Sequence, residues 1–248
     1  MRSCHRCAQT FERGWKKMLS RQKFVAPAIV GTLLLVTLLV AAGIDLFQGP
    51  KYPVFVTPDF IEPAVVTIPL PDNVSPQIGQ LIASAIEQTQ LTTGYDPAYV
   101  RIDYPYGDVP IETGVCSDVV VRAFRKAGID LQKEVHEDMG RAWAEYPKKW
   151  GAAGRDTSID HRRVGNLTTY FERQGKSRPV IPDPSQFLPG DIVSWDLGNK
   201  VDHIGIVVNV WAEQSERYLI VHNIGSGARM EDVLLNWEIT GHYRYFAN

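Results

Sequence analysis

The chain has 248 residues, of which 44% are hydrophobic and 22% charged, an ordinary globular composition with room for one sizeable domain and extensions. The formal net charge of −2 is unevenly spread, because the first 24 residues hold seven basic side chains and one acidic one, a net +6, which leaves −8 for the rest. A body this acidic argues against a nucleic-acid partner, since affinity for a phosphate backbone is built from Lys and Arg.

Residues 1–24 form a basic leader, and the run that follows at 25–44, VAPAIVGTLLLVTLLVAAGI, contains no charged residue. A helix of that length would span roughly 30 Å, the thickness of the hydrocarbon core of a bilayer. The positive-inside rule then places the N-terminus in the cytoplasm and residues 45–248 outside. We therefore expect a single-pass protein of the cytoplasmic membrane with an external C-terminal domain. A signal peptide cleaved near Ala41-Ala42-Gly43 is the alternative.

The cysteines fall into two groups under this topology. Cys4 and Cys7 lie in the leader and are interpreted as reduced cytoplasmic thiols, because no second pair of metal ligands lies nearby. Cys116 is the only cysteine of the exported part. It has no partner there for an intrachain disulfide, so it is either a buried residue or a reactive thiol.

Residues 45–76 are rich in proline, with seven prolines between positions 50 and 76. Such a segment is stiff and extended and could reach on the order of 80 Å at about 3.1 Å per residue. We interpret it as a stalk that holds the domain at 77–248 away from the membrane. The alternative is that its apolar clusters, such as Val65-Val66, pack on that domain.

The domain at 77–248 is expected to be α+β, with helices packed on an antiparallel sheet. Apolar residues at helical spacing predict a helix over 77–91, and a second apolar face predicts a helix from Cys116 that Gly128 ends. A long polar excursion follows, with one short helix around 165–174. Four strand signals come last: LPGDIVSWDL, VDHIGIVVNV, RYLIVHNIG and ITGHYRYF.

Cys116 stands at the predicted start of its helix, where unpaired N–H groups and the helix dipole stabilise a thiolate. The thiolate is the nucleophile, and a nearby imidazole is needed to take the proton of the thiol. Considered alone, a cysteine on the apolar face of a helix is more often a core residue. The two interpretations are separated by where the histidines lie.

His203 and His222 can be placed by strand register. If strands 201–210 and 217–224 form a hairpin centred between residues 213 and 214, Gly205 faces His222. His203 and His222 then share a face as diagonal neighbours, roughly 5–8 Å apart, so one imidazole could orient the other. A register slip of one residue would put Asn223 in that place, and an asparagine could also orient the base. Gly205 would leave room for the approaching helix.

The segments GVCSDVVVRAFRKAGIDL, LPGDIVSWDL, DHIGIVV and LIVHNIG together resemble the papain-like cell-wall peptidases of the NlpC type. TTGYDPAYVRIDYP, DTSIDHRRVGNL and TGHYRY resemble the bacterial domain-of-unknown-function family 1287 more closely. The resemblance implies a papain-like fold in which Cys116 is the nucleophile, His203 the general base and His222 the orienting residue. One departure is Val115, where the NlpC-type enzymes often have aspartate.

The implied reaction is hydrolysis of an amide through an acyl-enzyme, with peptidoglycan peptides as the substrate and no cofactor. Helix-end N–H groups would hold the oxyanion, and a tyrosine of the preceding loop, Tyr104 or Tyr99, would add a donor. Paired arginines suit carboxylates, so the cluster DTSIDHRR could bind substrate or could instead be a solvated, self-paired loop. Its candidate residues are Asp160, His161, Arg162 and Arg163.

Three alternatives stay open. The domain could be a cell-wall-binding module without catalysis, or a thiol acyltransferase. The order Cys, His, His favours the hydrolase over those acyltransferases in which the histidine precedes the cysteine. A zinc site formed by Cys116, His203 and His222 is the third alternative.

Overall fold

The computed structural model describes residues 64–151 and 153–246. The predicted leader, the predicted membrane span and most of the predicted stalk lie outside these residues. Within the described residues, no helix has the length and apolar character needed to cross a bilayer.

The described part is α+β, as expected, with four α-helices and six strands. The helices are α3 (Pro76–Leu91), α4 (Cys116–Lys126), α5 (Leu131–Ala142) and α6 (Val164–Arg173). Short 3-10 turns are η2 (Trp143–Glu145), η3 (Lys149–Gly151), η4 (Asp160–Arg162) and η5 (Pro184–Gln186). The strands are β1 (Val65–Thr67), β2 (Ile192–Asp196), β3 (Asp202–Ala212), β4 (Arg217–Asn223), β5 (Ala228–Glu231) and β6 (Glu238–Tyr243).

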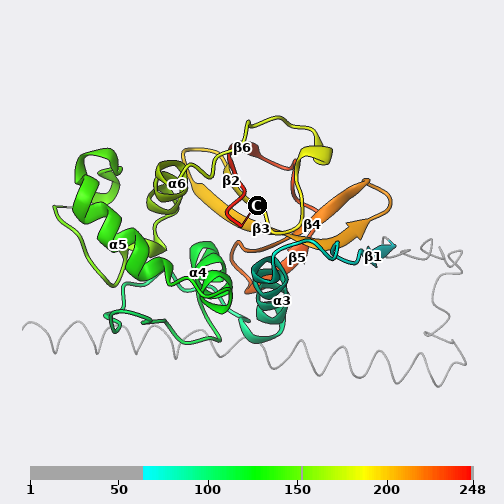
Figure 1. Cartoon of the computed structure of the whole chain (residues 1–248). Helices are drawn as coiled ribbons and strands as arrows, with labels where there is room; N and C mark the ends of the chain where they lie inside the picture. The colour runs from blue at the N-terminus through cyan, green and yellow to red at the C-terminus, as the bar shows by residue number, and fades with distance from the viewer. Residues whose placement is uncertain (1–63, 152, 247–248) are drawn as a thin grey trace, which may run out of the picture. The chain divides into compact units, whose positions relative to one another are not determined.

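The strands form one antiparallel sheet in the order β5-β4-β3-β2-β6, and the helices lie along one side of it (Figure 1). β1 pairs with the far end of β3, where Val65 lies opposite Ala212. Because Val65–Thr67 belongs to the sheet, the folded domain begins earlier than the predicted boundary at residue 77. Val65 and Val66 join the domain through strand pairing, while their side chains stay exposed.

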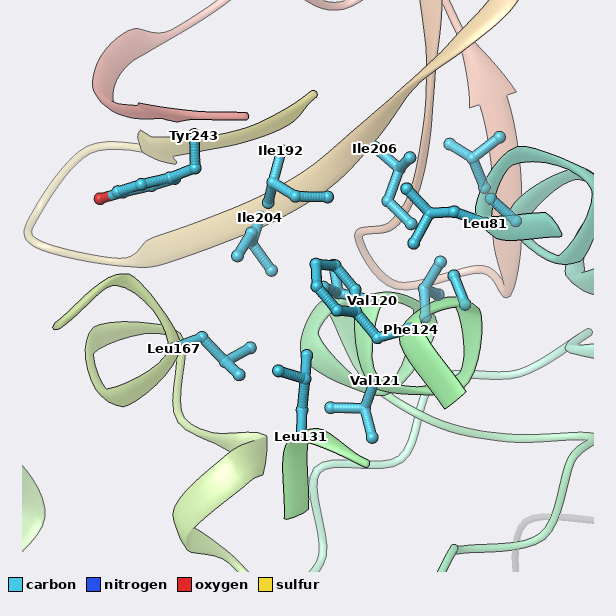
Figure 2. Close-up of a cluster of buried hydrophobic side chains, with 14 of the residues drawn as sticks. Leu81, Val120, Val121, Phe124, Leu131, Leu167, Ile192, Ile204, Ile206 and Tyr243 are labelled. Atoms are coloured by element: carbon cyan, nitrogen blue, oxygen red, sulfur yellow. The ribbon is translucent and has the colours of Figure 1, made fainter. Parts of the chain in front are cut away.

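The main core lies between the helices and one face of the sheet. Phe124 and Val120 of α4 are fully buried and point toward Ile204 and Ile206 of β3 (Figure 2). Burying one such side chain stabilises the fold by about 1.5–3 kcal/mol. The helical spacing of these apolar residues therefore fixes which side of α4 meets the sheet, and with it the place of Cys116 at the start of the helix.

A smaller apolar cluster covers the opposite face of the sheet. Val193 and Trp195 of β2, Val207 of β3 and Ile220 of β4 pack there with side chains from the connections before β2 and after β5. Side chains alternate along a strand, so His203 points to this second face while its neighbour Ile204 points to the helices. This alternation decides how the candidate site is assembled.

The excursion at 129–185 contains a second helix, α5, besides the one predicted around 165–174. Asp138 of α5 is buried and pairs with Arg173 at 2.6 Å. Arg122 of α4 also faces inward: it binds Asp108 at 3.0 Å and donates to the carbonyl groups of residues 109, 110 and 113. It thereby fixes the loop that leads into Cys116.

Candidate active site

Cys116 is the first residue of α4, as predicted, and only 6% of it is exposed. Backbone N–H groups of Ile204, Ser117 and Cys116 itself are directed at the sulfur. Burial nevertheless dominates and raises the pKa of the thiol to about 12, because desolvation disfavours the thiolate more than these N–H groups favour it. The resting side chain is therefore a thiol, not the thiolate that the helix start alone predicts.

His203 and His222 form a hydrogen-bonded pair, with 2.8 Å between Nε2 of His203 and Nδ1 of His222. The rings of Trp195 and Trp237 pack against the pair. The Trp237 ring centroid lies 6.0 Å from that of His203 and 6.2 Å from that of His222. Burial lowers the pKa of both imidazoles, that of His203 to about 3. The predicted contact between the two histidines is confirmed, and both rings are neutral near pH 7.

The predicted register holds at the site and fails toward the turn. Ile206 lies opposite Val221 and Val207 opposite Ile220, as expected, but an irregularity follows and Trp211 lies opposite Tyr218. The pairing shifts in that stretch, so the turn at 213–216 is centred between residues 214 and 215, one residue later than predicted. The hydrophobic alternation fixes the register beside the histidines, whereas the irregularity leaves no clear mark in the sequence.

Cys116 and the histidines reach the site from opposite faces of the sheet. The paired register of β3 and β4 ends at Ile206 and Val221, and the Ile204 N–H beyond it is directed at the sulfur. Among the described residues, the His203 side chain hydrogen bonds to His222 and not to Cys116. The missing side chain of Gly205 leaves space for Ile220 and His222 on the second face of the sheet. An added Cβ would lie 2.7 Å from Ile220 and 3.2 Å from the His222 side chain. The expectation that Gly205 clears space for the helix was wrong.

Glu231 is a site residue that the sequence did not reveal. Its Oε2 lies 3.0 Å from Nε2 of His222, so a polar chain runs across β3, β4 and β5. Strand β5 was not predicted because it has only four residues, ARME, after a glycine-rich turn. The turn itself, GSG at 225–227, was the available signal for one more hairpin.

A cavity of about 310 Å³ opens at Cys116. It is lined by Tyr95, Pro97, Val115, Cys116, Ile159, Arg162, Arg163, Val164, Lys200, Val201 and Asp202. Tyr95 is 41% exposed, and partial burial is the main cause that raises the pKa of its hydroxyl. The tyrosine beside the cysteine is therefore Tyr95 and not either of the two that were predicted.

The two predicted tyrosines lie elsewhere. The Tyr104 ring packs against His136 of α5 with 5.3 Å between the ring centroids. The Tyr99 hydroxyl donates to Asp156 at 3.0 Å. Neither residue lines the cavity at Cys116.

Arg162 is a structural clamp and not a solvated or free substrate ligand. Its Nε donates to Asp118 of α4 at 2.8 Å, and a second guanidinium nitrogen lies 2.9 Å from the same carboxylate. It also donates to the carbonyl groups of Asp96 and Ala98, which hold the loop of Tyr95. Both charged side chains are almost fully buried, so this pair fastens that loop to the turn of α4 that carries Cys116.

The other members of the DTSIDHRR cluster are divided between core and cavity. Asp160 is buried and lies 2.9 Å from Nδ1 of His136. His161 is buried, and burial lowers its pKa to about 4. Arg163 and Ile159 are half-buried and line the cavity at Cys116.

Asn223 does not contact His203. Its amide nitrogen donates to the carbonyl groups of Gly94 and Gly114 at 3.1 and 3.0 Å. Asn223 therefore holds the loop that leads into Val115 and Cys116, and the side chain that contacts His203 is that of His222. Among residues 64–151 and 153–246, no group of three His, Cys, Asp or Glu side chains with the arrangement of a metal site is found.

The buried histidines predict a loss of stability in mild acid. His161 and His203 have folded pKa values of about 4 and about 3, below the ordinary 6.5. A lowered pKa contributes stability that is present above pH 6.5 and is lost as the pH falls through 6.5 toward the folded value. Each should therefore cost on the order of 2 kcal/mol between pH 7.5 and pH 5. Urea unfolding at the two pH values measures this. His161→Gln should weaken the dependence, and an unfolding free energy that is flat or higher at pH 5 would contradict the assignment.

Comparison with known proteins places the chain in a family. Residues 82–245 match the family described as "Domain of unknown function (DUF1287)". The protein named YijF from Escherichia coli (strain K12) is 48% identical over 215 residues, which cover 87% of this chain and 98% of that protein. The chain therefore belongs to the DUF1287 family, as its motifs predicted.

Two solved structures overlap with the domain. One is described as similar to lipoprotein, NLP/P60 family, from Staphylococcus aureus subsp. aureus Mu50. It is 13% identical with a TM-score of 0.36, over 73% of this chain and 44% of that one. The other is described as an N-acetylmuramoyl-L-alanine amidase from Bacteroides uniformis ATCC 8492. It is 14% identical with a TM-score of 0.42, over 68% of this chain and 99% of that one.

Proposed function

We propose that the chain is a cysteine hydrolase of amide bonds that acts on peptidoglycan peptides at the outer side of the cytoplasmic membrane. The observation that carries the proposal is the hydrogen-bonded pair of His203 and His222 beside the backbone N–H that is directed at Cys116. The motif resemblance to NlpC-type peptidases supports the wall as the substrate, and the apolar run at 25–44 supports the location.

The chemistry starts from two neutral groups. As the sulfur of Cys116 attacks the carbonyl carbon, His203 takes the thiol proton, so no thiolate has to exist beforehand. The thiol must turn toward His203 for this step. N–H groups at the start of α4 hold the oxyanion, with the Tyr95 hydroxyl as a further donor. The C–N bond then breaks, the proton passes from His203 to the leaving amine, and water cleaves the thioester to give an acid and the free thiol.

Cys116→Ala tests the proposal in the full-length protein in detergent. Wild type should release soluble fragments from purified peptidoglycan, and the variant should release none, because the covalent step is lost. Cys7→Ala is the matched control, since it removes a thiol of the leader and should keep the wild-type rate. Release by Cys116→Ala at the wild-type rate would remove Cys116 from the mechanism.

One observation favours a second function. Cys116 is buried and its pKa is raised, which suits a cell-wall-binding module of the same fold that does not use the thiol. Such a module would bind peptidoglycan equally well as wild type and as Cys116→Ala, and neither form would release fragments. Pelleting with insoluble peptidoglycan, run beside the release assay, separates the two functions.

A further inference from the structure

Three neighbouring strands supply one polar chain on the second face of the sheet. His203 of β3 contacts His222 of β4 at 2.8 Å, and His222 contacts Glu231 of β5 at 3.0 Å. Glu231 lies opposite Ile220 in the β4–β5 register, so it points to the same face as His222. The histidines are buried, whereas 40% of the Glu231 side chain is exposed. This row of hydrogen-bonded side chains thus runs from the buried His203 to the partly exposed Glu231 on the outer strand.

The Glu231 carboxylate determines which nitrogen of each imidazole donates a hydrogen bond and which accepts one. An ionised carboxylate only accepts hydrogen bonds, so Nε2 of His222 carries the proton that Glu231 accepts. A neutral imidazole has one N–H, so Nδ1 of His222 is then an acceptor and takes the hydrogen bond from Nε2 of His203. Nδ1 of His203 is left as the unprotonated nitrogen. With both rings neutral, this is the one arrangement that satisfies both contacts.

We propose that Glu231 is a positioning residue that fixes the tautomers of both imidazoles and so makes Nδ1 of His203 the atom that accepts the thiol proton. The catalytic part rests on the proposed function, whereas the tautomers do not depend on any activity. Without the carboxylate, His222 can donate from Nδ1 to His203 instead. His203 would then carry its proton on Nδ1 and could not act as the base from that atom.

Glu231→Lys tests this most sharply, because an ammonium group only donates hydrogen bonds, so Nε2 of His222 would have to accept and both tautomers would reverse. In full-length protein with ¹⁵N-labelled histidine, ring-nitrogen shifts should place the His203 proton on Nε2 in wild type and move it to Nδ1 in Glu231→Lys. Glu231→Asp keeps the acceptor and should retain the wild-type tautomers. Glu238→Lys, which makes the same change at an exposed carboxylate at the start of β6, is the matched control and should change neither ring.

The kinetic expectation is a fall in kcat of about 10- to 100-fold for Glu231→Lys with KM unchanged, because Glu231 acts through His222 and does not touch the reacting atoms. Glu231→Asp should keep a large part of the wild-type rate. Wild-type tautomers in a folded Glu231→Lys protein would overturn the proposal, and so would an Nδ1 proton on His203 in wild type. If the tautomers switch as expected but wild type hydrolyses no wall preparation, the proposed function falls and the control of the tautomers by Glu231 stands.

Discussion

His203→Ala should lower the rate of fragment release by about 10²- to 10⁴-fold, the range that a positioned general base contributes. The reason is specific to this site. Burial raises the pKa of the Cys116 thiol to about 12, so almost no thiolate exists at neutral pH unless a base takes the proton during attack. Initial rates on soluble peptidoglycan fragments at pH 7.5 measure the effect.

Two controls belong with this measurement. His5→Ala removes an imidazole from the leader at residues 1–24 and should leave the rate unchanged. Circular dichroism shows whether His203→Ala keeps its fold. A folded His203→Ala protein with a rate within threefold of wild type would mean that another group takes the proton.

Arg162→Met should destabilise the protein by about 3–5 kcal/mol, because it leaves the buried, charged carboxylate of Asp118 with the Val115 N–H but without its cationic partner. The same change frees the Tyr95 loop, which Arg162 holds through the carbonyl groups of Asp96 and Ala98. The free energy of unfolding, measured by urea titration at pH 7.5, is the readout.

The matched control is Arg141→Met, which removes an exposed arginine whose contact with Asp138 is 3.5 Å long. That change should cost no more than about 1 kcal/mol, as exposed ion pairs contribute little. The double variant Asp118→Leu/Arg162→Met should recover part of the loss, since no uncompensated charge remains. An Arg162→Met protein as stable as Arg141→Met would show that Asp118 is compensated in another way.

The sequence was informative wherever periodicity and alternation determine burial. The helical spacing from Val119 to Phe124 predicts α4 and places Cys116 at its start. The alternation in DHIGIVV predicts that His203 shares a face with Val207, and the same argument places His222 beside it. These features depend on local chemistry that a single strand or helix displays.

Contacts between distant segments could not be predicted in the same way. Arg162 and Asp118 are 44 positions apart, and neither local sequence indicates that the two side chains form a buried ion pair. Arg162 was therefore considered as a ligand for substrate. Tyr95, Tyr99 and Tyr104 share one loop, and only the clamp at Asp96 and Ala98 decides which of them reaches the cysteine. The side of the sheet on which α4 packs is likewise a tertiary choice. It follows from the apolar face of Ile204 and Ile206 and not from Gly205.

The most direct test of the account is the mass of the full-length protein quenched during turnover of a soluble peptidoglycan peptide. A nucleophilic Cys116 predicts an adduct equal to the acyl half of the substrate, with the amine lost, located on the Cys116 peptide. It should be absent from Cys116→Ala and should disappear when substrate is exhausted. Hydrolysis without any adduct at Cys116, at a rate that Cys116→Ala matches, would contradict the account.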